Sequence, residues 1–143
     1  MRNTVWLLPA GVLLFSGTLA AQQPATKAIA SVKELHDAMI SPSSDAIFDI
    51  GRAAPKDAAG WSALRNHAII LAEAGNLMMV EGRAKDKGEW MKLSRALVDA
   101  AAVALKAVQA KNADGVVKAG DQIVMICEDC HGPYRDNGRG MRR

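Results

Sequence analysis

Two cysteines and one histidine within the five residues CEDCH, positions 127–131, are the part of this sequence best suited to covalent or metal chemistry. The chain has no other cysteine. On a helix, Cys127, Cys130 and His131 would share one face, because they differ by three and four positions. Thiols at this spacing can form a disulfide, bind a metal ion, or add to the two vinyl groups of a haem whose iron the adjacent imidazole then binds.

The Cys-x-x-Cys-His order is the attachment signature of c-type haem, so it predicts thioether bonds at Cys127 and Cys130 and a proximal iron ligand at His131. A structural disulfide would close a very small loop and gain little chain entropy. A thioredoxin-like dithiol needs its pair at the start of a helix after a strand. A zinc site would need two histidines beside the thiols, and the chain has only His36, His67 and His131.

The first residues of the chain have the pattern of a secretory signal. Arg2 precedes an apolar run from Val5 to Phe15, and SGTLAAQQ then offers small residues for cleavage after Ala20 or Ala21. The run is shorter than the roughly 20 residues of a membrane span, so an uncleaved anchor is the less favoured alternative. The pattern predicts a signal peptide over 1–21, one domain over 22–135, no membrane span after cleavage, and a bacterial periplasmic location.

The charge balance argues against a nucleic-acid partner. The chain carries 18 basic and 15 acidic side chains, a formal net charge of +3. Loss of the signal removes Arg2 alone, which leaves 17 basic and 15 acidic groups and a charge of +2. Glycine and arginine dominate the end of the chain, so residues 136–143 are predicted to form a flexible basic tail.

The spacing of apolar residues predicts an all-α fold with four helical stretches and no strand. Four helices with short links favour an antiparallel four-helix bundle with the CxxCH motif on its last helix. The expected stretches are about Thr26 to Ile40, interrupted at Ser41-Pro42 and continued over 44–52; about Trp61 to Val80; Trp90 to Ala110; and a last helix capped by Asp114 that carries Cys127 and Cys130.

Export, four helices and a single CxxCH near the end of the chain together resemble the class II cytochromes c, which comprise cytochrome c-prime and its six-coordinate relatives. The closest matches are CEDCHGPYR and VKELHDAM, the latter at the position of the family's distal helix. The resemblance implies one covalent haem c between the helices, often in a homodimer, with His131 as proximal ligand and Arg135 near the proximal haem face. Pro133 departs from the family pattern, because proline would clash with the carbonyl of Asp129 in a continuing helix.

The resemblance also implies that the sixth iron position decides the function. Filled by a protein ligand, it makes an electron carrier that serves redox partner proteins; left open, it binds NO or CO. The first helix offers His36 and Met39 as candidate distal ligands, with a solvated His36 as the alternative. We therefore predict a periplasmic mono-haem electron carrier, with gas binding as the alternative. No general base or nucleophile is evident, so the protein is not expected to be an enzyme.

The other histidine and the large apolar residues have more ordinary expected roles. His67 is expected to pack or to hydrogen-bond, with a haem propionate as one acceptor. Met78 and Met79 are expected to fill the core. Trp61 and Trp90 are expected to pack between the helices or against the haem.

Overall fold

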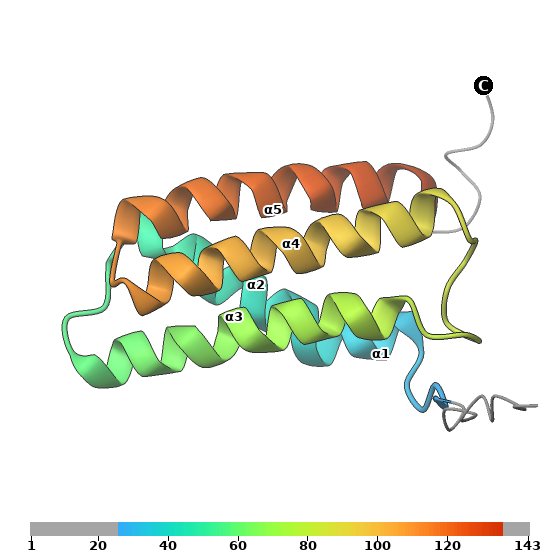
Figure 1. The fold of residues 1–143 in the computed structure, drawn as a ribbon, viewed down its shortest axis with the longest axis horizontal. Coiled ribbons are helices and arrows are strands. Elements are labelled where there is room, and N and C mark those ends of the chain that lie inside the picture. Colours follow the sequence, from blue (N-terminus) through green and yellow to red (C-terminus); the bar gives the residue numbers. More distant parts are fainter. Residues whose placement is uncertain (1–25, 136–143) are drawn as a thin grey trace, which may run out of the picture.

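The computed structural model describes residues 26–135, so the predicted signal peptide and the predicted tail lie outside the described residues. Within 26–135 the structure contains helices and no strand. Figure 1 shows their order. The elements are α1 (Val32–Leu35), the π-helical turn η1 (His36–Ile40), α2 (Ser41–Phe48), the 3-10 turn η2 (Asp49–Gly51), α3 (Ala58–Met78), α4 (Glu89–Gln109) and α5 (Ala113–Tyr134).

Four helical segments pack against one another, which confirms the all-α prediction. The elements α1 to η2 follow each other without a break and form the first segment. The helices α3, α4 and α5 reverse direction at each connection, and α4 lies between α3 and α5 (Figure 1). The first segment contacts both α3 and α5 through α2, so all four segments enclose one core. None of the described helices combines the length and the apolar character needed to cross a membrane.

Short polar side chains determine where three of the segments begin. Ser31 forms a capping box at the start of α1, while Asp57 and Asn112 each accept a backbone N–H in the first turn of α3 and α5. The first helix therefore begins at Val32, later than predicted. The cap of the last helix is Asn112, and the prediction of Asp114 is wrong because that residue already lies inside the first turn.

A widened π turn precedes Pro42. The N–H of Ser41 donates to the carbonyl of His36, five residues earlier. In a regular α-helix the ring of Pro42 would press on the carbonyl of Ala38, and the wider turn relieves this clash. The predicted interruption at Ser41-Pro42 is therefore a local change of winding, and the chain continues as α2 in the same segment.

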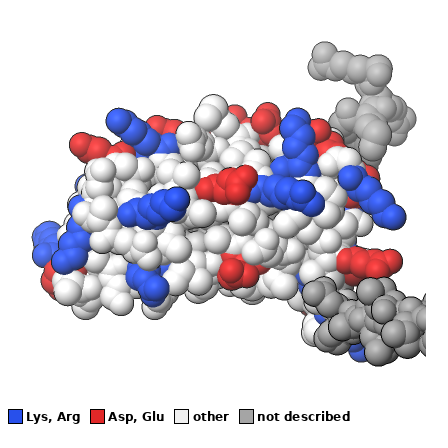
Figure 2. All heavy atoms as spheres, viewed as in Figure 1, with Lys and Arg blue, Asp and Glu red and all other residues white. Residues whose placement is uncertain are grey.

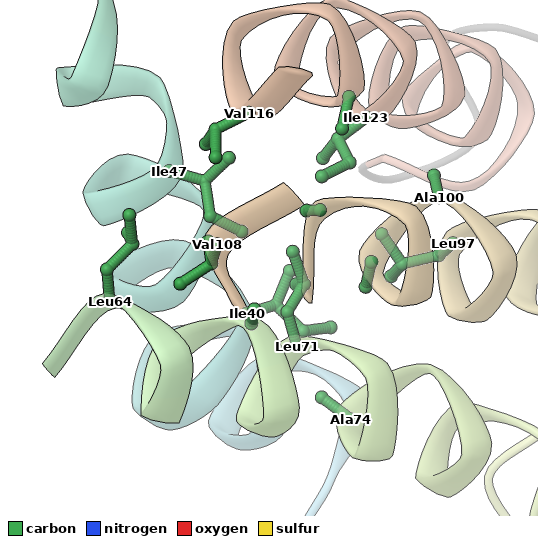
Figure 3. Packing of buried hydrophobic residues seen from close by; sticks show 14 of the residues in the cluster. Ile40, Ile47, Leu64, Leu71, Ala74, Leu97, Ala100, Val108, Val116 and Ile123 are labelled. Atoms are coloured by element: carbon green, nitrogen blue, oxygen red, sulfur yellow. The ribbon is translucent and has the colours of Figure 1, made fainter. Parts of the chain in front are cut away.

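The core is built almost wholly from aliphatic side chains and alanines that all four segments contribute (Figure 3). Trp90 is the large exception, and it is 2% exposed. Small residues in α3 and α4 let these helices approach closely. Fully buried positions include Ile47, Ala68, Leu71, Ala74, Ala101, Ala104, Val116 and Ile123.

Gly75 lies where α3 and α4 approach each other closely. A Cβ atom placed there would lie 2.7 Å from Cγ2 of Val98 and 3.2 Å from the carbonyl oxygen of Ser94. Because the second of these neighbours is backbone, Gly75→Ala would push the two helices apart. We expect the variant to lose about 1–3 kcal/mol of unfolding free energy, measured by urea denaturation.

Gly120 provides the matched control for Gly75→Ala. It is also a buried helical glycine, but its added Cβ would meet Phe48 at 3.5 Å, an ordinary contact distance. Gly120→Ala is therefore expected to be neutral, or to stabilise by up to about 1 kcal/mol through the lower backbone entropy of the unfolded chain. Equal losses in both variants would contradict the close approach at Gly75.

Charged side chains of both signs are interspersed on the face seen in Figure 2. Within residues 26–135, three exposed ion pairs link neighbours on the same helical segment: Lys33 with Asp37, Arg52 with Asp49, and Lys92 with Glu89. Exposed pairs of this kind contribute little to stability. The fold therefore depends on its apolar core.

Candidate functional site

His36 and His131 come together at one end of the molecule, although 95 positions separate them in the sequence. Their ring centroids lie 5.6 Å apart, with the ring planes tilted by 41°. The two rings border a small cavity of about 40 Å³. The other residues that line it are Ile40, Met78, Leu93, Ser94, Leu97, Ile126, Cys127 and Cys130.

The helix α5 delivers the three residues of the CxxCH motif to this cavity. Cys127, Cys130 and His131 all border it and are all half-buried, as expected for side chains on one helix face. Near its start α5 packs on α2, where Gly120 faces the ring of Phe48. Near its end the facing group is the imidazole of His36, so the motif lies where aromatic rings and a cavity separate α5 from η1.

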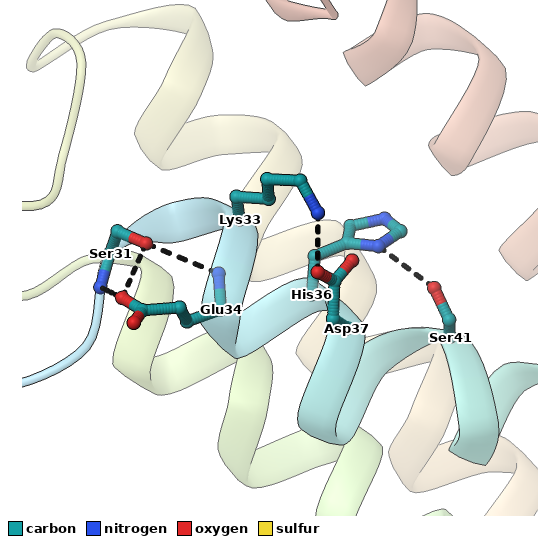
Figure 4. Close-up of polar contacts among 6 residues, drawn as sticks. All are labelled: Ser31, Lys33, Glu34, His36, Asp37 and Ser41. Atoms are coloured by element: carbon teal, nitrogen blue, oxygen red, sulfur yellow. Dashed lines mark hydrogen bonds and ion pairs between the residues drawn. The ribbon is translucent and has the colours of Figure 1, made fainter.

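A hydrogen bond holds the imidazole of His36. Its Nδ1 lies 2.8 Å from Oγ of Ser41, and the second ring nitrogen points away from that hydroxyl (Figure 4). When Nδ1–H donates to Ser41, Nε2 carries the free lone pair that a metal ion requires. The same segment keeps its charges on the exposed side, where Lys33 pairs with Asp37 (Figure 4).

The surroundings of His131 favour its neutral imidazole form. Burial lowers its pKa below the usual 6.5, and the nearby His36 and Arg135 lower it further. A lowered pKa favours the neutral imidazole at physiological pH. Neutral imidazole is a good iron ligand, so the local environment prepares this side chain for coordination.

The two thiols have raised pKa values, whereas those of a redox dithiol are lowered. Burial raises the pKa of Cys127, with further contributions from Cys130 and Glu128, and burial also raises the pKa of Cys130. Catalytic dithiols have lowered pKa values at the start of a helix. Here both thiols lie in the last turns of α5, so the thioredoxin-like alternative is poorly supported.

Slow thiol alkylation is therefore expected in the haem-free chain. Because the thiolate is the reactive form and both pKa values lie above 9.0, reaction with iodoacetamide at pH 7 should be slower than that of a free cysteine. The rate should rise about tenfold per pH unit up to at least pH 9. A rate that already levels off near neutral pH would contradict the raised pKa values and favour a redox dithiol.

The spacing of the two imidazole rings is compatible with ligation of one iron atom. Two imidazoles on opposite sides of one metal ion have ring centres roughly 6 Å apart, because each metal–nitrogen bond is about 2 Å long. The centroids of His36 and His131 are 5.6 Å apart, close to this spacing. The remaining lining is mostly apolar, as a porphyrin requires, while the cavity of about 40 Å³ has the size of one or two water molecules. A macrocycle would therefore have to spread the end of α5 from η1.

Neither Met39 nor Arg135 lines the cavity that His36 borders. Met39 is half-buried and packs on the core without lining the cavity, whereas Ile40 does line it. The α-helical spacing predicted His36 and Met39 in one sector, but the wider winding of η1 turns position 39 away and brings position 40 beside His36. Arg135 is exposed, and its N–H donates to the carbonyl of His131.

The remaining predicted residues divide between the cavity and the rest of the core. Met78 lines the cavity, whereas His67 lies on α3 outside it with a buried Nδ1 that has no hydrogen-bond partner among the described residues. Pro133 lies in the last turn of α5, and the chain leaves the helical path at Arg135. Residues 26–135 contain no group of three or more His, Cys, Asp or Glu side chains arranged to hold a metal ion.

Ser41 is a site residue that the sequence interpretation missed. In an α-helix, positions five apart do not face each other, so the spacing from His36 gives no signal for this contact. The π turn creates it. Leu93 and Leu97 of α4 also line the cavity.

No protein-family model, no curated protein and no solved structure matches the chain. Its function is therefore inferred from the residues around the cavity and from the motifs that they form.

Proposed function

We propose that the protein is a periplasmic mono-haem c-type cytochrome that carries electrons between redox partner proteins. Cys127 and Cys130 would hold haem c through thioether bonds, with His131 as the proximal and His36 as the distal iron ligand, inside an antiparallel four-helix bundle. The facing pair of imidazoles, 5.6 Å apart beside the two thiols, is the observation that carries this proposal.

Haem iron would supply a reversible one-electron couple, and the protein would hold and shield it. His36 is hydrogen-bonded to Ser41, and burial lowers the pKa of His131, which favours its neutral form. Apolar side chains such as Leu97 and Ile126 line the cavity and would limit the access of water to the haem. Shielding and axial ligation are the means by which a protein sets a haem reduction potential.

Gas binding at an open iron position is the less well supported alternative. It needs a distal side without a strong ligand, and here an imidazole faces His131. Met39 is also a weaker candidate than His36 as the distal ligand, because it does not line the cavity. Gas binding would be favoured if the hydrogen bond between His36 and Ser41 were strong enough to keep the imidazole from the iron.

The optical spectrum of the ferrous protein tests the proposal. The chain would be exported in a bacterial host that attaches c-type haem, then purified and reduced. We expect a low-spin spectrum and slow, weak binding of carbon monoxide, because two imidazoles would occupy the axial positions. A high-spin spectrum with ready carbon monoxide binding would favour the gas-binding alternative, and a colourless protein would contradict both.

A further inference from the structure

The ends of α3, α4 and α5 meet beside the candidate site and are joined by one small cluster, formed by Met78, Asp86, Trp90 and Tyr134. Figure 1 shows that the end of α3, the start of α4 and the end of α5 lie at the same end of the molecule. Tyr134 is three positions after His131 and so lies one turn further along the same side of α5. Through Tyr134, the cluster therefore contacts the helical turn that carries His131, the predicted proximal ligand.

Tyr134 is held on two sides. Its hydroxyl donates a hydrogen bond to Oδ2 of Asp86, in the loop between α3 and α4. Its ring packs edge-on against Trp90, with centroids 5.0 Å apart and an interplanar angle of 86°. Such a T-shaped pair is a favourable aromatic geometry.

The partners of Tyr134 are themselves fixed. The other carboxylate oxygen of Asp86 accepts the N–H groups of Gly88 at 2.8 Å and Trp90 at 3.1 Å, so Asp86 also closes the start of α4. The indole N–H of Trp90 donates to the carbonyl of Met78 at 2.8 Å. Met78 also borders the cavity. A continuous set of contacts thus runs from Tyr134 to the cavity wall.

The last turn of α5 needs this external support. Pro133 has no N–H to donate within the helix, and Gly132 has no neighbouring group within 4 Å of an added Cβ. The helix ends one residue later, at Tyr134. The bond to Asp86 therefore supports a helical turn whose own backbone holds it weakly.

We propose that Tyr134 and Asp86 are positioning residues for His131: they anchor the end of α5 to the start of α4 and thereby set the orientation and strength of proximal iron ligation. This inference rests on the proposed function, because it assigns His131 to iron. Outer-shell partners of metal ligands commonly change metal binding by about 10- to 100-fold when they are removed. Here the effect would pass through the backbone of one helical turn.

The hydrogen bond itself can be tested without reference to haem, because Tyr134 is the only tyrosine of the chain. Its bond to Asp86 raises the pKa of Tyr134 to about 12, and the same bond lowers the pKa of Asp86. Ultraviolet titration of the full chain should therefore show phenolate forming well above pH 10. Asp86→Asn should move this transition towards 10, whereas Asp121→Asn, at an exposed carboxylate on α5 outside the CxxCH motif, should not. A transition near 10 in the wild type would overturn the inference.

The effect on the iron is tested in the haem-loaded protein with Tyr134→Phe, which keeps the ring beside Trp90 and removes the hydroxyl. In a His36→Ala background, where His131 would be the remaining axial ligand, acid titration of the haem spectrum reports loss of His131. Tyr134→Phe should weaken this ligation about tenfold, so the transition should move about one pH unit towards neutral. Asp121→Asn should leave it unchanged.

The possible results separate the two proposals. If Tyr134→Phe shifts neither this transition nor the reduction potential of the otherwise wild-type holoprotein, the inference is overturned while the haem assignment stands. If the purified chain lacks haem, the proposed function itself has failed. Urea denaturation of Tyr134→Phe measures any general loss of stability. Such a loss alone would not change the reduction potential of the folded protein.

Discussion

Replacement of both Cys127 and Cys130 by serine is expected to abolish covalent haem binding. Each thioether would form by addition of one thiol to one vinyl group, and a serine hydroxyl does not undergo this addition under the same conditions. The variant should lose its haem completely during acid-acetone extraction, whereas the wild type should keep it. Each single variant should retain one tether and therefore remain red, at reduced yield.

Val124→Ser is the matched control for the cysteine variants. It introduces the same residue on the same helix, at an apolar position that is 39% exposed and outside the cavity. This variant should keep its haem through extraction. Extraction of haem from the wild type, or retention of haem in the double variant, would contradict thioether attachment.

Replacement of His36 by alanine is expected to convert a low-spin, six-coordinate iron to a high-spin, five-coordinate iron. The variant removes the imidazole that faces His131 and leaves a position at which carbon monoxide can bind. The ferrous spectrum and the rate of carbon monoxide binding would both report the change. An unchanged low-spin spectrum in His36→Ala would remove His36 from the coordination shell.

Two companion variants sharpen the test of His36. Ser41→Ala removes the hydroxyl 2.8 Å from Nδ1 and should weaken the distal bond about tenfold, seen as tighter carbon monoxide binding. Met39→Leu nearly preserves side-chain volume but removes the sulfur. It should leave the spectrum low-spin, and conversion to high-spin would identify Met39 as the distal ligand instead.

Much of the fold could be predicted from the sequence, because its long helices are regular. Apolar residues of α4 recur at helical spacing, so Trp90 to Ala110 was predicted within one residue at each end. The helix α3 continues through Gly75, although a glycine inside a helix is unfavourable. The physical reason is tertiary, since the glycine allows the backbone of α4 to approach.

The geometry of the candidate site was less predictable. The CxxCH spacing places Cys127, Cys130 and His131 on one face, and the structure brings them to one cavity. The approach of His36 depends on packing between the first segment and α5, which local spacing does not encode. Its contact with Ser41 depends on the wide turn before Pro42 and could not follow from α-helical periodicity.

The most direct test of the central claim is the mass of the exported wild-type chain under denaturing conditions. Covalent attachment at Cys127 and Cys130 predicts a mass that exceeds the signal-cleaved polypeptide by that of one haem, located by proteolysis on the peptide that contains CEDCH. A polypeptide mass without haem, from a host that loads a known c-type cytochrome in parallel, would contradict it.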